Sequence, residues 1–200
     1  HVELTDGGVV GDRGYAVVDR ADGKVASAKQ PRKWKGLLHL EAAYVEPPTP
    51  GEDLPPVTVT FPDGSSARSD RAGLDAALSS YLGRDVAMAA VVPAGATFEE
   101  VWPDISGLAP ASFIDATMTG RSEAGEATSS IELGSLAPGS FKDVAPLHVL
   151  TESTLTELAR LSPGVDYDRR RYRPNIVLRT PRVGFVENTW VGGALLVGGC

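Results

Sequence analysis

Arginine is concentrated in one short stretch of an otherwise acidic chain. Four of the five residues 169–173 are arginine, whereas the 200-residue protein has a formal net charge of −7. Arg173 stands directly before Pro174 and Asn175, and an apolar run follows, so proline fixes the backbone where a strand should begin. The planar arginine fork suits phosphate or carboxylate, and asparagine adds a donor and an acceptor. The pattern predicts an anion site at Arg173 and Asn175. A solvated charged face is the alternative.

Two further segments have residues suited to an anion. Gly11-Asp12-Arg13 reads as a turn that delivers an arginine to the start of a strand. Thr151 and Ser153 stand at the expected start of a helix, where free backbone N–H groups and the helix dipole favour an anion. Plain helix capping is the open alternative for these two residues. Together the segments predict a phosphorylated or otherwise anionic ligand held by basic loops on a β scaffold.

Several other kinds of site are excluded by their missing motifs. The sequence has neither a Gly-x-x-x-x-Gly-Lys-Ser/Thr phosphate loop nor a Gly-x-Gly-x-x-Gly turn. It has no His-Glu-x-x-His, no Cys-x-x-Cys and no Gly-x-Ser-x-Gly, which argues against the usual zinc sites and a hydrolase elbow. The three histidines are scattered, and for His39 a structural role is favoured.

Composition narrows the class of protein further. A single cysteine cannot form an internal disulfide, so a disulfide-stapled secreted scaffold is excluded and a cytoplasmic location is expected. The acidic balance disfavours nucleic acid or an anionic membrane as partner. The apolar stretches 86–96 and 191–197 are too short and broken to span a bilayer. With 22 glycines and 15 prolines, the chain favours turns and short elements.

The elements that must position these residues are mostly short strands. Alternating and β-branched residues predict strands in the first half at 14–19, 24–29 after an Asp22-Gly23 turn, 37–45, 57–61 and 86–92. A helix is expected between a Ser69-Asp70 cap and Gly83. Residues 94–140 show little periodicity and read as a long connection with a short strand or turn near 112–116.

The second half shows clearer local patterns. Strands are expected at 144–150, 175–178, 183–186 and 195–197. The helix 151–161 is predicted by Leu155, Leu158 and Leu161 at helical spacing and by a capping box of Thr154 and Glu157. Many short strands with two modest helices favour a mainly β, barrel-like architecture.

The ordered motifs resemble one known family. Gly11-Asp12-Arg13 and its following strand resemble the N-terminal β-barrel domain that precedes MOSC (molybdenum cofactor sulfurase C-terminal) domains. The segments 141–155, 171–177, with its arginine–proline–asparagine signature, and 185–199 resemble successive parts of the MOSC domain itself. The resemblance implies an N-terminal β-barrel-type domain at 1–93, a barrel-like MOSC domain at 94–200 and a few short helices.

The resemblance also implies a cofactor and its contacts. MOSC proteins similar to this one bind a molybdenum–molybdopterin cofactor through basic and polar residues in these segments. Carried over by position, the cofactor-binding residues are Arg13, Thr151, Ser153, Arg173 and Asn175, with Lys29 and Arg32 added from the second hairpin strand. Cys200, the one thiol, is a candidate catalytic residue because thiolate is a soft ligand suited to such metals. No residue is assigned as a metal ligand.

The relatives implied by the resemblance are the mitochondrial amidoxime-reducing component and bacterial reductases of N-hydroxylated compounds. By this likeness the protein is a molybdenum-dependent oxidoreductase that reduces N-hydroxylated or related small substrates. The resemblance also implies an electron donor, either a ferredoxin-like domain or protein or a cytochrome. One alternative is a sulfur-carrier or cofactor-binding MOSC module without redox turnover. Another is an ordinary β-rich domain whose arginines bind an unrelated phosphate.

Two family features fall outside the sequence. The family's Lys-Ser pair would precede His1, and its metal-binding cysteine lies further beyond the closing glycine segment than Cys200 does. We therefore expect that both ends are trimmed. We also expect residues 1–200 alone to hold a simple anion rather than molybdenum.

Overall fold

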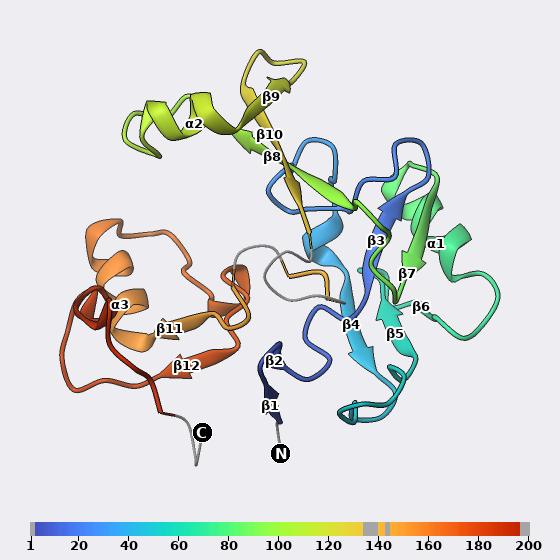
Figure 1. The fold of residues 1–200 in the computed structure, drawn as a ribbon, viewed down its shortest axis with the longest axis horizontal. Coiled ribbons are helices and arrows are strands. Elements are labelled where there is room, and N and C mark those ends of the chain that lie inside the picture. The colour runs from blue at the N-terminus through green and yellow to red at the C-terminus, as the bar shows by residue number, and fades with distance from the viewer. Residues whose placement is uncertain (1–2, 134–139, 143–144, 197–200) are drawn as a thin grey trace. The chain divides into compact units, whose positions relative to one another are not determined.

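The computed structural model describes residues 3–133, 140–142 and 145–196 (Figure 1). The chain divides into two compact units, His1–Val144 and Ala145–Cys200. The boundary expected between residues 93 and 94 lies inside the first unit and stays a prediction about domain organisation. Across the described residues the fold is mainly β, with small sheets and a few short helices, and these residues form no closed barrel.

The first unit contains most of the strands. Their bounds are β1 Leu4–Thr5, β2 Gly8–Val9, β3 Ala16–Asp19, β4 Glu41–Tyr44, β5 Val57–Thr60, β6 Ser66–Arg68, β7 Val86–Ala89, β8 Thr97–Trp102, β9 Met118–Arg121 and β10 Ala127–Glu132. The helices are α1 Leu74–Leu82 and α2 Ala111–Thr117, with a 3-10 turn at Leu37–His39. The strands pair antiparallel in the orders β1-β2, β3-β7, β4-β5-β6 and β8-β10-β9.

The larger core of this unit lies between β5 and α1. Val57 and Val59 are buried while the threonines between them are only half-buried, as the alternation of 57–61 predicts. Leu74 and Leu78 are buried from the helix side and belong to the same cluster. A smaller cluster gathers around Phe98 on β8. The strands expected at 14–19 and 57–61 are confirmed.

Several expected elements of the first unit are wrong. Residues 94–140 are no plain connection, because β8, β9, β10 and α2 lie within them. The register pairs β8 with β10 over their whole length, so backbone hydrogen bonds stabilise strands whose polar side chains hide their periodicity. The returning strand 24–29 is reduced to a bridge at Val25, and 37–39 is a 3-10 turn. Gly73, and not Ser69-Asp70, is the N-cap of α1.

The second unit is a small parallel pair with one helix beside it. It contains β11 Val149–Thr151, β12 Ile176–Leu178, α3 Glu152–Leu161 and the 3-10 turns Arg169–Arg171 and Val186–Trp190. The helix expected at 151–161 and the strand expected at 175–178 are confirmed. Of the strand expected at 144–150, the end forms β11, residues 145–148 form no strand, and residue 144 lies outside the described residues. The strand expected at 183–186 is wrong, because those residues lead into a 3-10 turn. Residues 195–196 form no strand, and 197 lies outside the described residues.

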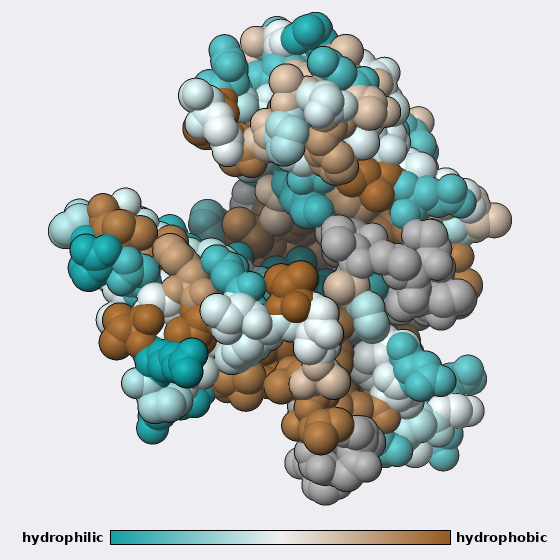
Figure 2. All heavy atoms as spheres, turned by 60° about the vertical axis from the view of Figure 1, so that its left-hand side comes forward, coloured by the Kyte–Doolittle hydropathy of each residue, from teal (hydrophilic) through white to brown (hydrophobic). Residues whose placement is uncertain are grey.

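Apolar burial is sparse in the second unit. Of its described residues, Leu150 is the one buried hydrophobic side chain, whereas Val183, Val191 and Leu196 are 75%, 90% and 80% exposed. Figure 2 shows apolar side chains reaching the surface among hydrophilic ones on the face in view. Polar contacts must therefore contribute a large share of this unit's internal order. Across the described chain, none of the helices has the length and apolar character needed to cross a membrane.

Candidate functional site

Two arginines have a backbone conformation that side chains rarely adopt. Arg13 has φ 52° and Arg173 has φ 50°, and they are the only non-glycine residues with positive φ in the described ranges. The left-handed region costs a residue with a Cβ about 1–2 kcal/mol. Such strain persists where the surrounding structure enforces it, and it clusters at functional sites. Both arginines are among those that the sequence predicts to contact an anion.

Arg13 lies in a turn whose glycines are sterically required. The Gly14 N–H donates to Gly11 O at 3.2 Å, which closes the turn. A Cβ on Gly11 would lie 2.5 Å from Pro48, and a Cβ on Gly14 would lie 2.5 Å from the Tyr44 hydroxyl. The Arg13 guanidinium donates to the Asp12 carboxylate at 2.7 Å, and its side chain is 17% exposed. Close contacts with Pro48 and Tyr44 thus explain why glycines stand on both sides of Asp12 and Arg13.

The pKa of the Tyr44 phenol reports on the packing around the Arg13 turn. Burial raises the pKa of its phenol to about 12, and the nearby Tyr15 and Asp12 add to the effect. The unfolded chain loses this proton near the ordinary pKa of about 10. Because the folded pKa is the higher one, the stability that Tyr44 contributes is lost as the pH rises from about 10 to about 12. Titration of tyrosinate absorbance should show one phenol ionising last, and Tyr44→Phe should remove that transition.

Lys142 is a site residue that sequence reasoning missed. The side chain is buried, with 3% of the residue exposed, and its Nζ donates to Gly7 O. Burial lowers the pKa of this ammonium, and the charge of Asp12 offsets the effect only in part while that of Arg13 adds to it. Its neighbours Phe141 and Asp143 form no pattern that would mark a buried lysine in the sequence.

Arg173 follows directly on the 3-10 turn of the arginine run. Its N–H donates to Arg170 O at 3.3 Å. The Arg170 side chain binds Asp168 at 2.6 Å, and that hydrogen bond lowers the pKa of the Asp168 carboxyl to about 2. Asn175 is committed to the strand pair, because its N–H donates to His148 O and its Oδ1 accepts from the His148 N–H, each at 2.8 Å.

The start of α3 binds a carboxylate of the chain itself, Glu187. Thr151 is fully buried, and its oxygen caps α3 by accepting from the Thr154 N–H at 3.1 Å. Its hydroxyl also lies 3.0 Å from Glu187 Oε2, and the Thr154 hydroxyl donates to Glu187 Oε1. Ser153 Oγ lies 2.9 Å from Thr151 Oγ1. Capping, the alternative left open for Thr151, is what the structure shows. The capping box expected at Thr154 is wrong, because the cap lies at Thr151.

The Thr151 cap gives a test of this network. Thr151→Ala removes the acceptor for the Thr154 N–H and a donor to Glu187, so we expect the free energy of unfolding to fall by about 1–2 kcal/mol. Thr151→Ser keeps an oxygen in place and should lose less than half of that. Chemical denaturation of the three proteins measures the difference. An alanine variant as stable as the parent would contradict the assigned contacts.

Lys29 and Arg32 are held by carboxylates of the first unit. Lys29 Nζ lies 3.6 Å from Glu100 and stands over the Phe98 ring. Arg32 is exposed and binds Glu126, with Nη2 at 2.9 Å from Oε1. The structure therefore places Arg13, Lys29 and Arg32 in the first unit. Thr151, Ser153, Arg173 and Asn175 lie in the second.

The metal end of the predicted site is not covered by the structure. Cys200, the candidate thiolate, lies outside the described residues. Within the ranges that are described, no group of three or more histidine, cysteine, aspartate or glutamate side chains is placed to hold a metal ion. The described residues thus cover the predicted contacts to the cofactor's phosphate and leave out the candidate thiolate.

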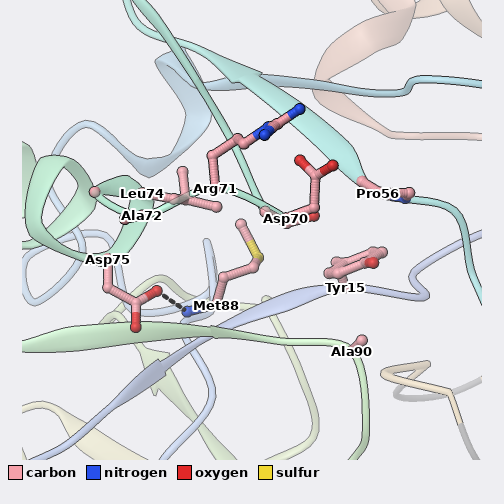
Figure 3. Close-up of a pocket in the computed structure, with 11 residues that line it drawn as sticks. Tyr15, Pro56, Asp70, Arg71, Ala72, Leu74, Asp75, Met88 and Ala90 are labelled. Atoms are coloured by element: carbon pink, nitrogen blue, oxygen red, sulfur yellow. Dashed lines mark hydrogen bonds between the residues drawn. The ribbon is translucent and has the colours of Figure 1, made fainter.

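A cavity of about 450 Å³ opens in the first unit beside the start of α1 (Figure 3). The side chains of Tyr15, Asp70 and Met88 gather around it. Its two carboxylates are engaged in the fold, because Asp70 binds Arg68 and Asp75 accepts from the Met88 N–H at 3.0 Å. None of the seven predicted cofactor contacts lines this cavity.

Comparisons of the chain with protein-family models, curated proteins and solved structures find no match.

Proposed function

We propose that this protein binds a molybdenum–pterin cofactor and reduces N-hydroxylated small molecules in the cytoplasm, with electrons from a ferredoxin-like domain or protein. The proposal includes a MOSC-type organisation, with an N-terminal β-barrel-type part and a barrel-like second part. One observation carries it. Of the three arginines that the resemblance assigns to the cofactor, Arg13 and Arg173, but not Arg32, have backbones held in the left-handed region.

The residues around Arg13 suit the phosphate end of such a cofactor. The guanidinium is largely shielded from solvent and already oriented by Asp12. Charge-assisted hydrogen bonds of this kind contribute about 1.5–3 kcal/mol each. Arg173 offers the same fork on a proline-fixed segment of the second unit. Each arginine, within its own unit, would neutralise phosphate charge and fix the direction of the bound group.

The hydroxyl residues fit less well. A phosphate beside Thr151 would meet the Glu187 carboxylate, which the Thr151 and Thr154 hydroxyls already bind, and the Ser153 hydroxyl lies against that of Thr151. We therefore assign phosphate binding to Arg13 and Arg173, and give Thr151 and Ser153 the role of ordering the second unit. Lys29 and Arg32 stay weaker contributors to the proposal, because neither has the left-handed backbone of Arg13 and Arg173.

When bound, the cofactor's molybdenum supplies redox chemistry in which an N–O bond is cleaved with two electrons and two protons, giving the amine and water. The test uses protein expressed from its complete reading frame in cells that make the cofactor. We expect it to reduce an N-hydroxylated amidine with a chemical reductant as electron source. Bound cofactor without turnover would instead favour a sulfur-carrier or cofactor-binding module. Absence of both cofactor and turnover would contradict the proposal.

A further inference from the structure

The loop that carries Arg13 is held at both ends by one distant segment. Gly7 O accepts a hydrogen bond from Lys142 Nζ, and Arg13 O accepts from the Phe141 N–H at 3.0 Å. Two consecutive residues thus bind the first and the penultimate carbonyl of residues 7–14, a segment that runs from the β1–β2 turn through β2 to the turn at Arg13 and is called loop 7–14 below. Because the donors come from more than a hundred positions along the chain, the fold as a whole sets this geometry.

The middle of the same loop has its own anchor. Tyr44 Oη donates to Gly11 O at 2.7 Å. Its ring also limits the space around both glycines, at 3.1 Å from a Cβ on Gly11 and with Oη 2.5 Å from one on Gly14. With three of its carbonyls bound from outside, the loop has little freedom to relax the left-handed backbone of Arg13.

Burial of the charged Lys142 side chain has a cost in folding stability. Because burial lowers the pKa of its ammonium, the unfolded chain binds this proton more tightly than the folded one, and the charged form costs stability at neutral pH. The stability lost to this charge is recovered as the pH rises through the lowered pKa. What the ammonium does provide is a strong donor for Gly7 O at the end of the Arg13 loop.

We propose that Lys142 and Tyr44 are positioning residues that fix the direction of the Arg13 guanidinium for a phosphate group. The inference rests on the proposed function, since it assumes that Arg13 binds the cofactor's phosphate. Neither residue touches the ligand. Each acts through a backbone carbonyl of loop 7–14, so each should change cofactor retention more than it changes stability.

The test compares Lys142→Met and Tyr44→Phe with a matched control, Tyr15→Phe. Tyr15 packs against Tyr44 at 6.0 Å between ring centroids and donates to Pro55 O at 3.2 Å, outside the loop. In protein from the complete reading frame, we expect the pterin content of each of the two test variants to fall about five-fold. A loss of this size corresponds to one hydrogen bond. Their melting temperatures should fall by less than about 4 °C. Tyr15→Phe should keep its pterin.

Hydrogen exchange gives a second readout that needs no ligand. The Asp12 and Gly14 amides donate within the loop, and we expect their exchange to accelerate about ten-fold in Lys142→Met and Tyr44→Phe but not in Tyr15→Phe. Lys142→Arg keeps a cation and should restore part of the pterin content. If Arg13→Ala loses pterin while both test variants keep it with unchanged exchange, the positioning role is overturned and the proposed function stands. If Arg13→Ala keeps its pterin, the proposed function itself fails.

Discussion

Replacing Arg173 by alanine should remove most of the bound pterin, at least about ten-fold in affinity, while Arg169→Ala should keep it. The loss corresponds to a charge-assisted contact of about 1.5–3 kcal/mol. Arg173 is fixed by its own strained backbone and by the proline that follows. Arg169 and Arg173 are both exposed, but Arg169 lies at the start of the 3-10 turn and lacks the left-handed backbone of Arg173. Equilibrium dialysis measures the pterin affinity of both variants, each expressed from the complete reading frame.

A glycine variant separates binding from folding. Arg173→Gly removes the guanidinium but relieves the left-handed strain, so it should be about 1 kcal/mol more stable than Arg173→Ala. Both variants should lose pterin equally. Equal pterin retention by Arg173→Ala and Arg169→Ala would contradict the assignment of Arg173 to the cofactor.

Arg84→Ala should be the most destabilising of the substitutions considered, lowering the free energy of unfolding by about 3–5 kcal/mol. Its partner Asp19 is 1% exposed and accepts from Arg84 Nε at 3.0 Å and Nη2 at 2.6 Å. Lys33 Nζ lies further away, at 3.6 Å. Without Arg84, a buried carboxylate would lose its bidentate partner. Chemical denaturation of the variant measures the loss.

An exposed ion pair provides the control. Arg68 also donates through Nε and Nη2, at 2.9 Å and 2.8 Å, but to the two separate oxygens of Asp70 and at the surface, whereas both Arg84 bonds end on Asp19 Oδ2. Arg68→Ala should therefore change stability by no more than about 1 kcal/mol. Adding Asp19→Asn to Arg84→Ala removes the unpaired charge and should recover part of the loss. Comparable losses for Arg84→Ala and Arg68→Ala would show that burial of Asp19 is not the cause.

The sequence correctly predicted those helices and strands whose own residues show alternating or helical spacing or a capping glycine. The alternation of Val57 to Phe61 gives β5 directly, since its valines are buried. The leucine spacing of 155–161 predicts α3, although Leu161 is 54% exposed. Gly83 ends α1 with a left-handed φ of 66°, as expected for a C-cap glycine.

What sequence reasoning missed depends on partners far along the chain. The β8–β10 ladder stabilises polar strands that have no strong pattern of their own. Glu187 joins the start of α3 from 33 residues away, and Lys142 reaches Gly7 across 135. Spacing within a motif cannot reveal such pairs. The motifs identified Arg13 and Arg173 as candidate anion contacts. They could not predict the left-handed backbone that distinguishes these two arginines.

The most direct test of the central claim is the pterin and molybdenum content of the wild-type protein expressed from its complete reading frame, purified from cells that load a known molybdenum enzyme in parallel. If Arg13 and Arg173 hold the cofactor, pterin and molybdenum should be present in equal amounts, at about one of each per chain. Protein that is folded and contains neither, while the parallel enzyme is fully loaded, would contradict the claim.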